Sequence, residues 1–192
     1  TAVYYMPGGN SYTYETKGKK GVSVVGGDDK RAQTCLVSLN AAGQLLPFQG
    51  INDGQTAQSK PSPHARAQAE RDGWLFSLSH NHWSSMHTMK EWVDKIVAPY
   101  RQKKIDELKL QATQKMVLLL DLWSVHRSKE FRKWMKENHP HIILLYVPGG
   151  CTGKFQPCDV IVQRPFKASV TSDFQNWVAA QCADQISSGV LP

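Results

Sequence analysis

The sequence is poor in cysteine and has no long apolar run. Its 192 residues include four cysteines, none in a C-x-x-C pair, so we predict neither a disulfide framework nor a cysteine zinc site, and a reducing compartment fits best. No window reaches the roughly 18 apolar residues of a membrane span, and the start, TAVYYMPGGN, lacks the features of a signal peptide. With no internal repeat and 41% hydrophobic residues, we expect a single soluble domain over residues 1–192 and no membrane partner.

Two sequence patterns resemble functional motifs and fail on spacing. In VPGGCTGKF, Gly149 and Gly153 enclose three residues where a nucleotide-hydrolase phosphate loop has four, and Phe155 stands where Ser or Thr would hold Mg²⁺. We therefore exclude ATP or GTP hydrolysis, and expect Gly149 and Gly150 to permit a tight turn. The histidines of SHNHWSSMH lack the spacing that places two imidazoles on one helical face, which argues against a zinc site.

Positive charge is in excess. The formal net charge is +7 and the isoelectric point is near 9.3. A field of this sign favours polyanions, either nucleic acid or an anionic membrane surface. Composition alone does not decide between these partners and a basic protein that binds neither.

The first half of the chain predicts strands followed by a helix. Val, Tyr, Thr and Leu runs broken by Gly-Gly and Asp-Asp turns up to residue 51 indicate antiparallel strands joined by hairpins. The polar residues 52–73 are predicted as a surface loop. Thr88 with Glu91 fits a capping box, and apolar residues at helical spacing predict a helix from Thr88 that is kinked or ended near Pro99.

The second half predicts a strand, a helix, a strand and a helix. MVLLL (116–120) and IILLYV (142–147) are continuous apolar runs, and the latter suggests a strand covered on both faces. Ser128 is expected to cap the helix between them, and a last helix follows Pro165. This order implies a parallel strand pair with a right-handed crossover. The predicted fold class is α/β: a mixed five-stranded sheet, with an antiparallel hairpin part, a parallel centre and helices on both faces.

Two aspartates follow strands of the predicted parallel pair. Asp121 ends MVLLL, and Asp159 follows the loop that leaves IILLYV. Ligand sites in such sheets lie at the carboxyl ends of the strands, so the two carboxylates are candidates to meet there. Their repulsion would be relieved by divalent cations, and paired Mg²⁺ or Mn²⁺ ions carry out phosphodiester chemistry. The alternative is structural: Asp121 caps a turn and Asp159 is the N-cap of the next helix.

Further candidates surround these aspartates in the sequence. His126 is a ligand, a phosphate contact or a residue that orients Asp121, or else an ordinary loop histidine. Basic side chains suited to a phosphate backbone are Arg127, Lys154, Arg164 and Lys167, with a solvated helix face as the alternative. Trp83, Trp123 and Phe155 could stack on unpaired bases, although aromatic residues more commonly serve packing.

Together these stretches resemble a known family. LLLDLWSVHRSKEFRKWMKEN and IILLYVPGGCTGKFQPCDVIVQRPFK are similar to the core of the DDE superfamily endonuclease domain of pogo, Tigger and jerky-like transposases, relatives of the mariner group. GVSVVGGDDKRAQTC and GQLLPFQGI also resemble it. The resemblance implies an RNase H-like domain in which three acids bind two Mg²⁺ or Mn²⁺ ions, cut transposon ends and join them to target DNA. Asp121 is similar to the second acid and Asp159 to the third.

The resemblance also marks departures. Thr1 is similar to the Thr of the family's Asp-Glu-Thr or Asp-Gln-Thr motif, so the first acid is expected two residues upstream, and Asp28 and Asp29 are poor substitutes. Leu122 stands where many members have Asn. Two hypotheses follow: the catalytic core of a DNA transposase, or a domesticated domain that binds DNA or partners without cleavage. Family analogy further implies a nuclear location and a homo-oligomer.

Overall fold

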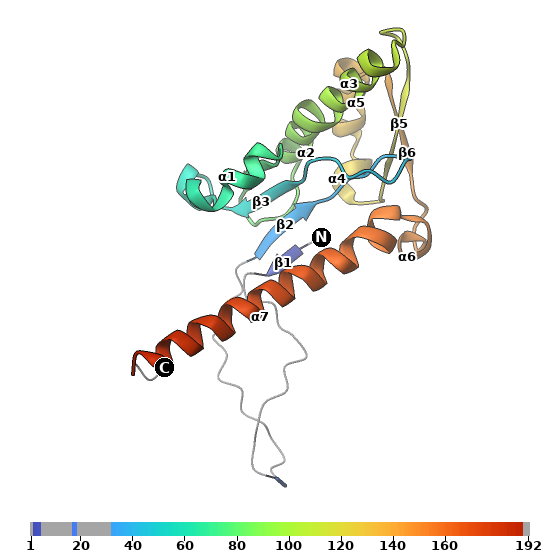
Figure 1. Ribbon diagram of the computed structural model, residues 1–192. Coiled ribbons are helices and arrows are strands. Elements are labelled where there is room, and N and C mark those ends of the chain that lie inside the picture. Colours follow the sequence, from blue (N-terminus) through green and yellow to red (C-terminus); the bar gives the residue numbers. More distant parts are fainter. Residues whose placement is uncertain (1, 5–16, 19–31, 190–192) are drawn as a thin grey trace.

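The structure is a computed structural model, and it describes residues 2–4, 17–18 and 32–189 (Figure 1). The strands predicted between residues 11 and 27, and the turn with Asp28 and Asp29, lie outside the described residues. The described chain combines strands and helices in a mixed α/β arrangement, as the sequence predicts. None of the described helices is both long enough and apolar enough to cross a lipid bilayer.

The strands form two separate sheets. The four-stranded sheet has the order β1-β2-β3-β4; β1, β2 and β3 are antiparallel neighbours, and β4 joins β3 in parallel. The two-stranded sheet is the parallel pair β5 and β6, in which Met116 lies opposite Ile142. The strand bounds are Ala2–Tyr4, Ala32–Leu36, Gln49–Asp53, Leu75–Ser79, Met116–Leu120 and Ile142–Tyr146.

The prediction of one five-stranded sheet is therefore wrong, although its antiparallel part and its parallel pair are both present. A cavity of about 930 Å³ lies between the sheets, lined by Thr34 and Leu36 of β2 on one side and by all five residues of β5 on the other. Across this cavity the backbones of β2 and β5 cannot hydrogen-bond directly. Among the described strands, β5 pairs with β6 alone.

The β5–β6 sheet is covered on one face, not on both. Along β5, Leu120 is 7% exposed whereas Val117 and Leu119 are 56% and 47% exposed. Ile143 and Leu145 of β6 alternate in the same way, at 40% and 49%. The prediction that the strand in IILLYV is covered on both faces is therefore wrong, because only one face of β6 is buried.

Residues 52–73, predicted as a surface loop, instead contain a 3₁₀ turn, Ala57–Ser59, and helix α1, Pro63–Arg71. The Ser62 side chain caps α1 by accepting from the backbone N–H of Ala65 at 3.2 Å, and Pro63 occupies the first turn. No residue of α1 is buried, so the helix has no apolar face that a periodicity search would detect.

The helix predicted from Thr88 begins earlier and continues further. Ser85 is the N-cap of α2 (Met86–Trp92), and it forms a capping box with Thr88, the third residue of the helix. A π-helical turn, η2 (Val93–Val97), then leads into α3 (Ala98–Leu108), so the chain stays helical through Pro99. Proline is accommodated because it lies in the first turn of α3, after the wider turn.

The remaining helices connect and follow β5 and β6. Ser128 caps α5 as predicted, and its hydroxyl accepts from the Phe131 backbone N–H at 3.1 Å. α7 runs on the opposite side of β1–β3 from α2 and α3 in Figure 1, and the Phe166 ring at its start packs edge-on against Phe48 at 5.5 Å. The bounds are Ser124–Arg127 for α4, Lys129–Asn138 for α5, Thr152–Phe155 for α6, Cys158–Val162 for the π turn η3, and Gln163–Ser187 for α7.

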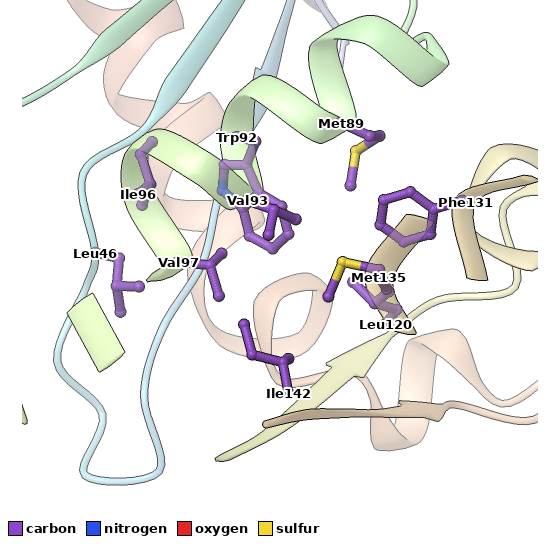
Figure 2. Packing of buried hydrophobic residues seen from close by; sticks show 10 residues of the cluster. All are labelled: Leu46, Met89, Trp92, Val93, Ile96, Val97, Leu120, Phe131, Met135 and Ile142. Carbon is purple, nitrogen blue, oxygen red and sulfur yellow. The ribbon is translucent and has the colours of Figure 1, made fainter. Parts of the chain in front are cut away.

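The main hydrophobic core lies between α2–η2, α5 and the inner face of β5–β6. Figure 2 shows Met89, Phe131 and Met135 packed near Leu120, and all four are buried. The other members of the cluster are Leu46, Trp92, Val93, Ile96, Val97 and Ile142. Because Leu120 is anchored here, the next residue, Asp121, leaves the core at a defined position.

Candidate active site at the ends of β5 and β6

Asp121 directly follows β5, at the carboxyl end of the strand as predicted. Its Oδ1 accepts a hydrogen bond from Nδ1–H of His126 at 2.6 Å and one from the Trp123 backbone N–H at 3.2 Å. The bond from His126 is the largest cause that lowers the pKa of Asp121 below its ordinary value. The side chain is 36% exposed, so an ionised carboxylate stands at the surface with one oxygen already oriented by the protein.

His126 lies in α4 and is buried beside the core. While Nδ1 faces Asp121, Nε2 lies 3.4 Å from Met89 Sδ, and the backbone carbonyl accepts from the Tyr146 hydroxyl at 2.8 Å. Both ring nitrogens thus face protein atoms. The geometry fits a residue that orients Asp121 rather than one that contacts a phosphate.

Asp159 lies in η3, the π turn after the β6 loop, and not at the N-cap of a helix. Gly150, with φ of 74°, makes the turn out of β6, and a Cβ on Gly149 would lie 3.5 Å from the Leu122 side chain, so this loop passes close to the residue after Asp121. Both observations agree with the predicted tight turn.

The pKa of Asp159 is raised above its ordinary value, in part by the charge of Asp121. Partial burial is the largest cause that raises the pKa of Asp159, and the negative charge of Asp121 raises it further. A hydrogen bond with the Gln163 side chain and the charge of Lys167 act in the opposite direction. The charge of Asp121 thus contributes to the raised pKa of Asp159, whereas the pKa of Asp121 is set mainly by His126.

This pair has the donor chemistry of part of a Mg²⁺ or Mn²⁺ site. Both ions prefer carboxylate oxygens, and a divalent cation would relieve the repulsion that raises the pKa of Asp159. In the part of the chain that the structure describes, no group of three or more His, Cys, Asp or Glu side chains is placed to share a metal ion. The two aspartates offer the type of ligand that these ions take, and among the described residues no third acid joins them.

The predicted basic residues are only partly brought to this site. The positive charge of Lys167 on α7 lowers the pKa of Asp159. Arg127 is exposed on α4 and lines a separate hollow of about 460 Å³ with Leu122, Ser124, Ser128, Arg132 and Tyr146. Lys154 on α6 and Arg164 on α7 are exposed.

Sequence reasoning missed two residues that hold the site together. Gln163 bonds to Asp159, and its position four residues later on a helical segment is a signal that could have identified it. Met89 lies against His126 from a distant helix, and no local pattern indicates that contact.

Comparison with known proteins identifies the family of the chain. The model of the DDE superfamily endonuclease family matches residues 30–190. Mouse and human proteins described as "Pogo transposable element with KRAB domain" are each 24% identical over 170 residues, which is 88% of this chain and 25% of theirs. The chain thus spans about a quarter of the length of these curated relatives. No solved structure matches significantly. The family match covers most of the chain, and the chain therefore belongs to the DDE superfamily endonuclease family.

Proposed function

We propose that this chain is the catalytic core of a DNA transposase of the pogo-like group, which cleaves DNA strands and transfers them with the help of Mg²⁺ or Mn²⁺. The observation that carries the proposal is the position of Asp121 at the carboxyl end of β5, where His126 orients it, while Asp159 follows the loop that leaves the parallel neighbour β6. Membership of the endonuclease family and the net charge of +7 support DNA as the substrate.

Each residue has a role in this proposal. Asp121 and Asp159 bind the metal ions, and His126 holds Asp121 ionised and correctly oriented. Divalent ions bound in such sites activate a water or hydroxyl and stabilise the leaving oxygen of a phosphodiester. The basic side chains position the phosphate backbone: Lys167, whose charge acts on Asp159, and the exposed Arg127, Lys154 and Arg164.

The finer features rest on the family. Three acids act together in its members, and by this analogy we expect Asp121 and Asp159 to be two of the acids of an RNase H-like site. By the same analogy with the family, we expect a nuclear location and a homo-oligomer that holds two transposon ends.

The test is metal-dependent nicking of DNA that contains the transposon ends, using the protein as its gene encodes it. Nicking should require Mg²⁺ or Mn²⁺ and should be lost in Asp121→Asn and in Asp159→Asn. Asp173→Asn, which removes one exposed carboxylate from α7, is the matched control and should nick normally. A protein with all three acids that nicks no such DNA with either metal would refute the enzyme proposal.

One observation favours a second function, a domesticated domain that binds DNA or partners without cleaving. Leu122 follows Asp121 where many family members have a polar residue. For such a domain we expect DNA binding that survives Asp121→Asn, together with no nicking by the unmodified protein.

A further inference from the structure

Two tryptophans form an exposed stacked pair beside the candidate site. Trp83 lies in the loop between β4 and α2, and Trp123 lies between β5 and α4. Their ring centroids are 5.9 Å apart with an interplanar angle of 18°, yet the residues are 45% and 39% exposed. His82 adds a third ring, 5.3 Å from that of Trp83 and tilted by 31°. The result is a row of three aromatic rings that is open to solvent.

Core packing does not account for this pair. Trp92, a member of the hydrophobic core, is 2% exposed, whereas neither Trp83 nor Trp123 belongs to that buried cluster. The exposed part of each ring contributes nothing to the hydrophobic stabilisation that full burial would give. His82 moreover adopts a left-handed backbone conformation, with φ of 53°, which is uncommon for residues other than glycine. Such conformations are often associated with functional sites.

The pair is directly connected to the candidate catalytic carboxylate. The backbone N–H of Trp123 donates to Asp121 Oδ1 at 3.2 Å, so its ring projects from the loop that orients this carboxylate. Trp83 and Trp123 also line the same cavity as Asp121 and His126. The rings thus lie at the end of the cavity where the candidate chemistry is located, although they come from loops of different sheets.

We infer that Trp83 and Trp123 form a stacking platform for an unpaired nucleobase of the DNA strand whose phosphate is presented to Asp121 and Asp159. This inference rests on the proposed function. Every base has a π face, so a base can stack on an open aromatic ring whatever its sequence. The net charge of +7 attracts the backbone, while the rings distinguish a base that is out of the duplex from one that is paired.

The test measures DNA binding without cleavage, by fluorescence anisotropy with Ca²⁺ in place of Mg²⁺. Three labelled DNAs with equal numbers of phosphates are compared: a duplex with a short single-stranded overhang, the same duplex with abasic overhang positions, and a blunt duplex. We expect the overhang with bases to bind about 5- to 150-fold more tightly than the abasic one, the range that base–aromatic stacking gives.

Variants assign the effect to the pair. Trp83→Ala and Trp123→Ala should reduce binding of the overhang with bases to the abasic level, and Trp83→Phe should retain most of the preference because it keeps a ring. Trp177→Ala is the matched control, since Trp177 is 59% exposed on α7, and it should bind like the unmodified protein. The comparison of overhangs with the unmodified protein needs no variant, so a variant that fails to fold does not remove the test.

Equal binding of the two overhangs by the unmodified protein would refute the platform, as would an unchanged preference in both folded alanine variants. Nicking assayed separately in Mg²⁺ distinguishes this failure from failure of the proposed function. Base-dependent binding without nicking refutes the nuclease and keeps the platform, whereas nicking without base dependence does the reverse. Absence of any DNA binding refutes both.

Discussion

The hydrogen bond from His126 to Asp121 should control the ionisation of the candidate metal ligand. His126→Leu removes the Nδ1–H donor and keeps an apolar side chain against Met89 and Phe131, whose ring lies 6.3 Å from that of His126. Since this bond is the main cause of the lowered pKa of Asp121, that pKa should rise in His126→Leu. In His126→Asn the side-chain amide N–H takes the place of Nδ1–H, so the pKa should stay low.

The bond should also contribute to stability in a pH-dependent way. A hydrogen bond to a charged group contributes about 1.5–3 kcal/mol when shielded. Asp121 is 36% exposed, so water competes for its oxygen and we expect His126→Leu to cost about 1 kcal/mol. Because folding lowers the pKa of Asp121, this contribution is complete above the unfolded pKa of about 3.9 and is lost as the pH falls through the folded value.

Two measurements check this reasoning. Carboxyl ¹³C NMR titration gives the pKa of Asp121 in the unmodified protein and in both variants. Urea unfolding at pH 7 and near pH 3.5 gives the free-energy difference between the unmodified protein and His126→Leu, which should shrink at the lower pH. An unchanged Asp121 pKa in His126→Leu, or a free-energy difference independent of pH, would show that His126 does not control this carboxylate.

Two further predictions concern the core and the cysteines. Phe131→Ala should lower the free energy of unfolding by about 3–5 kcal/mol, because Phe131 is 0% exposed and its removal leaves a cavity beside Met89. Urea unfolding measures this difference, and a loss below about 1 kcal/mol would contradict the packing. Burial raises the pKa of Cys35 to about 11, so iodoacetamide at pH 8 should label the exposed Cys182 first and Cys35 last. Peptide mass mapping measures the order, and early labelling of Cys35 in the folded protein would contradict its burial.

Local signals in the sequence predicted local structure well. The apolar runs 116–120 and 142–147 indicated the parallel pair, and Ser128 indicated the start of α5, because strand hydrophobicity and N-capping depend on neighbouring residues. α1 escaped detection although Ser62, Pro63 and good helix formers begin it, because a helix with no buried residue leaves little apolar periodicity. The separation of the two sheets depends on pairing between distant segments, which no local pattern encodes.

In the candidate site too, the sequence predicted local features but not contacts between distant segments. The position of Asp121 after an apolar strand identified it, since strand ends are where such sheets place ligands. That His126 would bind Asp121 with one ring nitrogen and face Met89 with the other depends on α2 packing against α4, which are far apart in the sequence. The contact of Trp83 with Trp123 likewise joins loops from different sheets.

The open edge of β5 has a consequence for how copies of the protein behave together. Backbone groups on that edge pair with no described strand, and Val117 and Leu119 stand exposed beside them. Such an edge is a template on which a strand of another chain can add. In free solution the net charge of +7 keeps copies apart, but a DNA backbone neutralises charge of this sign. The DNA binding proposed for this chain would therefore weaken the repulsion that opposes self-association, and copies would aggregate more readily on DNA than apart from it.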